Sequence, residues 1–195
     1  MDDKVVHLKD GTEVLIRLMR KDDLERSWLF FQELPEEDRE YLRVDVTKRS
    51  AVERRIRMID SGNVKRLVAL VDDRIVADGA LELERQEWAA HVGELRLIVA
   101  HSFQRKGLGT LMTRELYALA ASHKIEQIVV TMMRPQIAAR SIFRRLGFRE
   151  ELMLPDHVKD HSGRSQDLIL MRCDLEALWR ELEIFFTESD WRRSR

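Results

Sequence analysis

The stretch Glu94-Leu-Arg-Leu-Ile-Val99, followed by Ala-His-Ser-Phe and then by Gln104-Arg-Lys-Gly-Leu-Gly109, decides the fold of this chain. Residues 94–99 are typical of a β-strand, and the glycines introduce a helix whose apolar residues recur at helical spacing. The first backbone N–H groups of a helix lack acceptors within the helix, and they lie at its positive end. The sequence therefore predicts an anion site here, and we expect the anion to be a pyrophosphate.

Gly107 and Gly109 allow the backbone to approach a phosphate closely. We expect the amides from about Arg105 to Thr110 to face the pyrophosphate, with Arg105 and Lys106 adding positive charge. A Walker loop is excluded because Gly-x-x-x-x-Gly-Lys-Ser/Thr does not occur in the chain. A dinucleotide-binding turn is excluded because it needs a third glycine where the chain has Met112. A glycine pair that merely turns a strand into a helix stays open as an alternative.

Composition indicates a globular protein that forms one domain. The chain has 195 residues, of which 44% are hydrophobic and 35% charged. The net charge of −1 gives no general attraction to nucleic acid or to an anionic membrane. Apolar runs are shorter than a membrane span, the start does not resemble a signal peptide, and Cys173 is the single cysteine. We therefore expect a cytoplasmic protein with neither nucleic acid nor membrane as partner.

Periodicity and turn residues predict a mixed α/β sheet with helices on both faces. The predicted elements are a strand at 14–18, helices at about 22–33, after Pro35 and at about 47–60, a hairpin at 65–71 and 75–83, a strand at 92–99, the helix after the glycine turn, a strand at 128–132, a helix at 136–146, and strands at 148–154 and 166–173 around a polar loop at 156–165.

Four motifs in this order resemble those of the GNAT superfamily of acetyl-CoA N-acetyltransferases. They are the arginine-rich strand and acid-started helix of Val14–Asp23, the coenzyme A motif of Glu94–Thr110, the helix Gln136-Ile-Ala-Ala-Arg-Ser-Ile-Phe-Arg-Arg-Leu-Gly-Phe148, and the closing hairpin of Gly163–Met171. The resemblance extends from about residue 13 to residue 175. Within the superfamily, the chain is most similar to bacterial protein-lysine acetyltransferase domains.

The resemblance implies a mostly antiparallel sheet with a V-shaped splay between two parallel strands, which holds acyl-CoA. It implies Glu94 as the general base, the Ile98 and Val99 backbone as partner of the pantetheine arm, and residues 104–110 as the pyrophosphate site. It further implies acetyl-CoA as cosubstrate, no metal, and an amine acceptor such as a protein lysine or a small polyamine. The implied coenzyme A-binding residues are Ile98, Val99, Gln104, Arg105, Lys106, Gly107, Leu108, Gly109, Thr110, Gln136 and Phe143.

Two positions depart from the family pattern. Gln136 replaces an asparagine that reaches coenzyme A, and Phe143 replaces the tyrosine that protonates the departing thiolate. Because a thiol has a pKa of about 8.5, expelling it unprotonated at pH 7 costs only about 2 kcal/mol. We expect this loss to slow the reaction rather than abolish it. A non-catalytic acyl-CoA-binding regulatory module is the alternative function that Phe143 favours.

The role of Glu94 also has an alternative. A lysine amine has a reference pKa of about 10.4, so its attack on a thioester needs a base. Glu94 can serve if burial raises its pKa or if water relays the proton. An ordinary strand glutamate, solvated or ion-paired with Arg96 on the same face, is the other interpretation.

Two further segments are ambiguous. Asp156, His157, Asp160 and His161 could suggest a metal site, but they lie in a predicted polar loop, where no helix fixes the spacing of the histidines. A better alternative to metal binding is that this loop borders the acceptor site and supplies polar contacts. An apolar stripe follows the family core, and we expect residues 1–175 to form the domain. Residues 176–195 then form a helical extension that packs on that domain or at a homodimer interface. The stripe consists of Leu175, Leu178, Leu182, Phe185 and Phe186.

Overall fold

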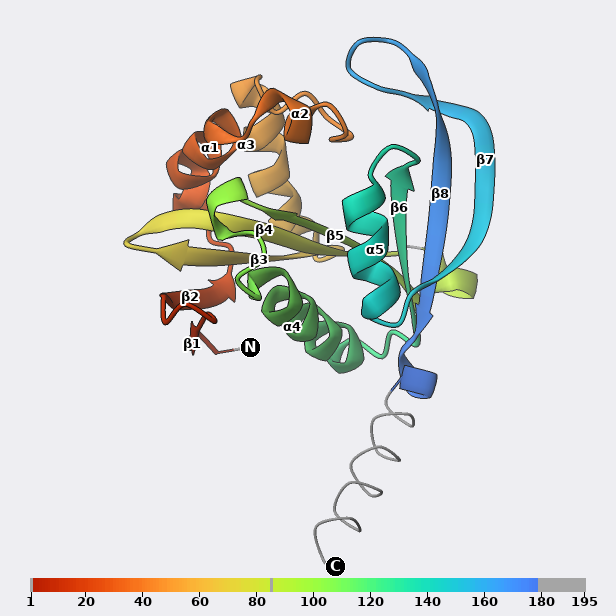
Figure 1. Cartoon of the computed structure of the whole chain (residues 1–195). Helices are drawn as coiled ribbons and strands as arrows, with labels where there is room; N and C mark the ends of the chain where they lie inside the picture. The colour runs from red at the N-terminus through yellow and green to blue at the C-terminus, as the bar shows by residue number, and fades with distance from the viewer. Residues whose placement is uncertain (1, 85, 179–195) are drawn as a thin grey trace, which may run out of the picture.

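The structure is a computed structural model that describes residues 2–84 and 86–178. Eight strands form one sheet in the order β1-β2-β3-β4-β5-β6-β8-β7 (Figure 1). The strands are β1 (Lys4–His7), β2 (Glu13–Leu18), β3 (Val64–Val71), β4 (Arg74–Leu83), β5 (Val92–Val99), β6 (Gln127–Met133), β7 (Arg149–Lys159) and β8 (Ser165–Asp174). The helices are α1 (Leu24–Glu33), α2 (Glu36–Arg39), α3 (Arg49–Arg57), α4 (Leu108–Ser122) and α5 (Ile137–Arg145).

The sheet opens between its two parallel neighbours, β5 and β6. They pair only at Val92–Gln127, Gly93–Ile128 and Glu94–Val129, near their first residues. Beyond Glu94, β5 stays paired with β4 and β6 stays paired with β8, so the two halves of the sheet diverge. All other neighbouring strands are antiparallel. The mixed sheet is therefore as the sequence pattern predicted, and the V-shaped splay is as the family resemblance implied.

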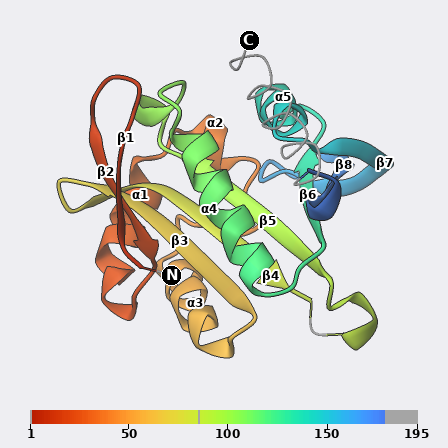
Figure 2. The same cartoon turned by 90° about the horizontal axis from the view of Figure 1, so that it is seen from below.

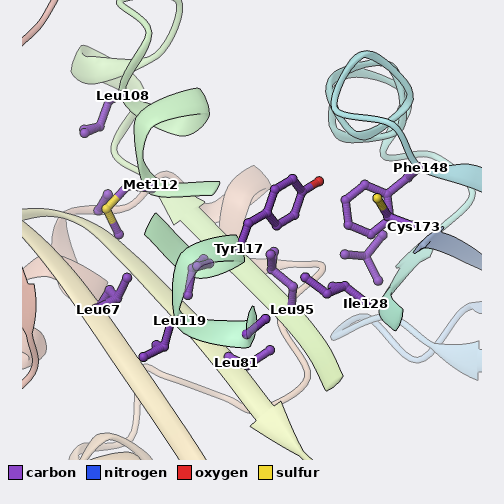
Figure 3. Close-up of a cluster of buried hydrophobic side chains, with 14 of the residues drawn as sticks. Leu67, Leu81, Leu95, Leu108, Met112, Tyr117, Leu119, Ile128, Phe148 and Cys173 are labelled. Atoms are coloured by element: carbon purple, nitrogen blue, oxygen red, sulfur yellow. The ribbon is translucent and has the colours of Figure 1, made fainter. Parts of the chain in front are cut away.

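Helices cover both faces of the sheet, because each strand alternates its side chains between them. Helix α4 crosses one face over β3, β4 and β5 (Figure 2). Its buried Leu108 and Met112 belong to one cluster with Leu67, Leu81 and Leu95 of those strands (Figure 3), and the buried Leu116 is part of the same cluster. On the other face, α1 and α3 cover a second cluster that includes Phe31, Val52 and Val68.

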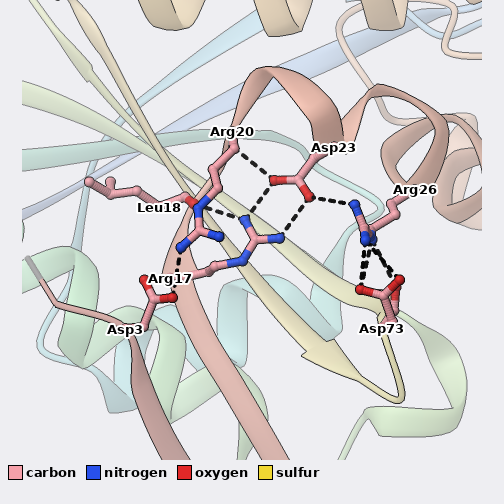
Figure 4. A network of polar contacts seen from close by, with 7 residues as sticks. All are labelled: Asp3, Arg17, Leu18, Arg20, Asp23, Arg26 and Asp73. Atoms are coloured by element: carbon pink, nitrogen blue, oxygen red, sulfur yellow. Dashed lines mark hydrogen bonds and ion pairs between the residues drawn. The ribbon is translucent and has the colours of Figure 1, made fainter.

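A buried ion pair fixes the start of α1 to the sheet (Figure 4). Arg17 of β2 donates two hydrogen bonds to Asp23, at 2.6 and 2.7 Å, and the Asp23 side chain is fully buried. Asp23 also accepts from the Arg20 backbone N–H at 2.7 Å, and Arg26 links the network to Asp73 in the β3–β4 turn. Each charge is thus compensated, as burial requires.

Two predicted elements differ from those in the structure, and a third lies mostly outside the described residues. The strand at 14–18 is the second strand, because Lys4–His7 pairs with it as β1. The polar loop expected at 156–165 is shorter, since Asp156 and His157 belong to β7 and only 160–164 connects it to β8. Residues 175–178 are helical, and the rest of the C-terminal stripe lies outside the described residues. No helix within the described residues has the length and apolar character that a membrane crossing needs.

Candidate active site

The turn from β5 into α4 presents a run of free backbone N–H groups. Arg105 has φ +60° and Gly107 has φ +92°, and this left-handed backbone turns the chain into the helix that starts at Leu108. Within the described part of the chain, the N–H groups of residues 105–110 have no acceptor. The Leu108 side chain is fully buried, so this residue offers only its backbone to a ligand. Such a series of amides at a helix start favours an anion.

The charges around this turn differ from those expected. Lys106 forms an ion pair with Asp10 in the β1–β2 turn, at 3.0 Å, so its charge is already compensated. Arg105 is exposed and forms no ion pair with a described residue. Lys9 lies against the same turn, because its N–H donates to the Lys106 carbonyl and its side chain is 3.7 Å from where a Cβ of Gly107 would stand. Lys9 is a cation that sequence reasoning missed.

The backbone of β5 faces the splay at alternate residues. The Ala100 N–H donates to the Val76 carbonyl of β4 at 2.9 Å. Because an antiparallel ladder alternates its direction, Val99 turns its N–H and C=O toward the splay and Ile98 turns them toward β4. Of the two residues predicted for the pantetheine arm, Val99 is therefore the better placed. Its carbonyl accepts a hydrogen bond from the Gln104 side chain at 3.2 Å.

Glu94 lies at the point where β5 and β6 begin to diverge. Thr131 of β6 donates to Glu94 Oε1 at 2.8 Å. Arg43, from the connection between α2 and α3, donates from Nη1 to Glu94 Oε2 at 2.9 Å and from Nη2 to both Glu94 Oε1 and Thr131 Oγ1. Arg96 of β5 lies 3.6 Å from the same carboxylate. The Glu94 side chain is about one-fifth exposed, with 22% relative accessibility.

These partners determine the protonation of Glu94. Burial alone would raise the pKa of this carboxyl, but the hydrogen bond and charge of Arg43, the Thr131 hydroxyl and the charge of Arg96 together hold its pKa below the ordinary value of 4.5. Burial therefore does not make Glu94 a stronger base, as one of the two expected routes required. The ion-paired interpretation describes this state, with Arg43 as the main partner, while Arg96 binds Glu82 more closely, at 2.7 Å.

The two departures from the family pattern lie at α5. Gln136 accepts a hydrogen bond from the Met133 N–H at 2.8 Å, so its side-chain oxygen is engaged at the start of the helix. Phe143 is partly buried and packs edge-on against Phe148, with ring centroids 5.1 Å apart. Figure 3 shows Phe148 beside Tyr117, whose hydroxyl donates to the Leu146 carbonyl at the end of α5.

The predicted acidic and histidine cluster at the β7–β8 hairpin tip takes part in polar contacts. The His161 Nε2 is 2.8 Å from the Leu42 carbonyl, and Arg164 binds Glu40 at 2.6 Å and Asp160 at 3.1 Å. The hairpin tip thus contacts the connection between α2 and α3 (Figure 1). Over residues 2–84 and 86–178, no three His, Cys, Asp or Glu side chains are grouped as a metal site would need.

Three site residues were not found from the sequence. Thr131 is a polar residue in the apolar run Ile128–Met132, and that contrast was a usable signal. Arg43 lies among many charged residues in a segment without periodicity, and Lys9 belongs to an unpredicted hairpin. The sequence around Arg43 or Lys9 does not indicate that either lies at the site, because contacts between distant segments of the chain bring both of them there.

Comparisons with known proteins find the same fold in other chains. The family model described as an acetyltransferase (GNAT) domain matches residues 31–161. A GNAT-family acetyltransferase structure from Streptococcus pneumoniae has a TM-score of 0.70 and 20% identity, covering 82% of this chain and 98% of that one. The GNAT domain of S. lividans PAT has a TM-score of 0.71 and 16% identity, with coverages of 88% and 96%. A ribosomal-protein-alanine N-acetyltransferase from Brucella melitensis has a TM-score of 0.70 and 20% identity, with coverages of 82% and 98%. No curated protein matches the chain in sequence.

Proposed function

Because the chain belongs to the GNAT acetyltransferase family, and so is an acetyl-CoA-dependent N-acetyltransferase, we propose that its acceptor is the primary amine of a protein lysine or a small polyamine. The acceptor amine attacks the thioester carbonyl, the C–S bond breaks, and coenzyme A leaves as the thiolate. The proton of the amine passes through water to Glu94, and water protonates the thiolate, since Phe143 has no proton to give.

One observation carries the assignment of the cosubstrate site. The N–H groups of residues 105–110 have no acceptor in the described part of the chain, and they lead into the positive end of the fifteen-residue helix α4. A diphosphate is a suitable ligand for these donors, with Lys9 and Arg105 as nearby cations. The Val99 N–H, which faces the splay, then lies between this turn and Glu94 along the strand, where the pantetheine arm would run, while the Val99 carbonyl is bound by Gln104.

Glu94 suits a relay better than direct proton abstraction. Its lowered pKa keeps it ionised at neutral pH, so it is always ready to accept a proton, but it holds that proton weakly. A water that is hydrogen-bonded to Glu94 can pass the proton on to solvent. The charged carboxylate also attracts the ammonium form in which an alkyl amine exists near pH 7.

Thiol release tests this function. Purified protein with acetyl-CoA is offered a lysine-containing peptide and spermidine, and free thiol is measured over time. We expect turnover with at least one of them, and a fall in kcat/KM of about a hundredfold in Glu94→Gln, the lower range for a general base. Glu33→Gln is the matched control, because Glu33 also pairs with an arginine, Arg74, outside the site. If acetyl-CoA binds but no alkyl amine releases thiol, the proposed acceptor class is wrong.

A further inference from the structure

We infer that Arg43 occupies the place of the acceptor's ammonium group on Glu94 and Thr131, and that the acceptor must displace it. Arg43 belongs to residues 40–48, which connect α2 to α3 and are here called the strap. This inference rests on the proposed function, because it concerns how the same acceptor site is filled. According to this inference, Arg43 does not bind the acceptor. It competes with the acceptor for Glu94 and thereby sets the acceptor's apparent affinity.

The contacts of Arg43 are those an alkylammonium ion would make. Its two terminal nitrogens donate to both oxygens of Glu94 and to the Thr131 hydroxyl, where β5 and β6 diverge. Both partners lie on strands of the sheet and are hydrogen-bonded to each other at 2.8 Å, whereas Arg43 comes from a connection between helices. A protonated amine presents three donors to the same oxygens. The guanidinium and the acceptor therefore compete for one carboxylate.

Charge makes simultaneous binding unfavourable. Glu94 already has a second cation, Arg96, at 3.6 Å, and Arg96 shares its charge with Glu82. Burial lowers the pKa of Arg96, and the charge of Arg43 lowers it further, so the two guanidinium groups repel each other. An arriving ammonium would bring a third positive charge to these two carboxylates. Exchange of Arg43 for the ammonium keeps the local charge unchanged.

The strap is built so that Arg43 can leave while its backbone stays in place. The Arg43 side chain is 41% exposed, and Glu94 and Thr131 are its hydrogen-bond partners among the described residues. On one side of Arg43, the Leu42 carbonyl is bound by His161. On the other side, the buried Val46 packs under α1 and its carbonyl accepts from Gln32. The backbone is tethered on both sides, and the arginine side chain is free to swing into solvent.

This arrangement favours a flexible cationic acceptor. An unbranched alkylammonium, such as a lysine side chain or a polyamine end, can replace a guanidinium on Glu94 without bringing a negative charge close to it. A free α-amino acid would place its carboxylate beside Glu94, which like-charge repulsion disfavours. Arg43 thus selects for acceptors that bind Glu94 strongly enough to displace it.

The test measures cation binding and turnover in the full chain, at constant ionic strength. The probes are n-butylammonium and methylguanidinium, and their binding is followed by NMR in the wild type, Arg43→Gln and Arg49→Gln. Arg49 is the matched control, because it has 44% exposure and pairs with Glu25 away from Glu94. We expect both probes to bind Arg43→Gln about tenfold more tightly than the other two proteins, as loss of one competing ion pair implies. Adding Glu94→Gln to Arg43→Gln should remove the gain.

The kinetic measurements should also show tighter binding of the acceptor when Arg43 is removed. In Arg43→Gln, the KM for the amine acceptor should fall about tenfold while kcat stays within a fewfold of the wild type. Arg43→Lys, which keeps a cation, should stay near the wild-type KM, and it serves if Arg43→Gln does not fold. A raised KM in Arg43→Gln would show that Arg43 binds the acceptor, and unchanged probe binding would show that it does not compete. Either result overturns the inference. If no amine is acetylated at all, probe binding still decides the role of Arg43, while the proposed function fails separately.

Discussion

Replacing Gly109 by alanine should separate the stability of the fold from the binding of acetyl-CoA. Gly109 is the second residue of α4 and has no left-handed backbone to preserve. A Cβ added there would meet only Val99, at 3.9 Å, which is an ordinary contact. Since alanine favours a helix over glycine by up to about 1 kcal/mol, the variant should fold at least as well as the wild type. For a chain of this size, Tm should rise by up to about 4 °C.

Binding should change in the opposite direction. Side chains on a helix tilt toward its N-terminus, so the new methyl group would stand among the amides of residues 105–110. Losing one hydrogen bond from these amides to a charged phosphate costs about 1.5–3 kcal/mol, which is about a 10- to 150-fold loss of affinity. Isothermal calorimetry with acetyl-CoA measures this loss, and thermal unfolding of the same sample measures stability.

Gly107→Ala provides the contrast. Its φ of +92° is costly for any residue with a Cβ, so that variant should lose about 1–2 kcal/mol of stability as well as affinity. If Gly109→Ala binds acetyl-CoA as tightly as the wild type does, the amides of this turn do not hold the diphosphate and the reasoning fails.

Three further predictions concern the buried ion pair, the base and the missing acid. Asp23→Ala should cost about 3–5 kcal/mol in urea unfolding, because it leaves Arg17 buried without its partner, whereas Arg17→Met with Asp23→Leu should recover most of that loss. Because the pKa of Glu94 is lowered, its charged form persists below pH 4.5, and the acid limb of the kcat/KM profile that Glu94 produces should lie below that pH. Arg43→Gln removes the main cause of the lowered pKa and should move this limb to higher pH, while Thr131, Arg96 and Glu82 are left as in the wild type. Phe143→Tyr should raise kcat by at most about thirtyfold, the rate equivalent of the 2 kcal/mol that an unprotonated thiolate costs at pH 7.

Each of these has a result that contradicts it. A loss below 1 kcal/mol in Asp23→Ala would show that the pair is not buried as described. An acid limb that does not move in Arg43→Gln would mean that another group titrates. A Phe143→Tyr variant whose rate is unchanged, but whose acetyl-CoA affinity is intact, would show that the tyrosine position does not reach the thiol.

The Arg17–Asp23 ion pair should also make the free energy of unfolding depend on pH in the acidic range. Burial alone would raise the pKa of Asp23, but Arg17, the Arg20 N–H and Arg26 hold it below its usual value of 3.8. A carboxyl with a lowered folded pKa stabilises the fold above its unfolded pKa. This contribution is therefore present above about pH 3.8 and is lost as the pH falls through the folded value. The Asp23→Leu variant with Arg17→Met should lack this component of the acid dependence.

The fold was largely predictable because its signals are local. The apolar stripe of α4, the glycines at 107 and 109 and the alternation in 92–99 each depend on residues close in the chain, and the elements formed as predicted. The length of the β7–β8 hairpin was not predictable in this way. Asp156 takes φ +50° at a bulge, and polar residues continue the strand beyond it. Pairing across the sheet overrides local polarity there.

The backbone structure of the candidate site was predictable, whereas the pairing of its charged side chains was not. Residues 105–110 form the turn with free amides where the glycine motif placed it. The partners of charged side chains depend on contacts between distant segments, such as Arg43 with Glu94 and Lys106 with Asp10. No pattern within a single stretch of sequence specifies these pairs, so the ion pair of Lys106 with Asp10 was not predicted.

An NMR titration that resolves individual backbone amides tests the central claim most directly. Isotope-labelled protein is titrated with acetyl-CoA, and the N–H signals of residues 105–110 are followed together with those of α3 as an internal reference. The account predicts saturable shifts at 105–110 and at Val99, with α3 unaffected. Signals at 105–110 that stay unchanged up to millimolar acetyl-CoA would contradict it.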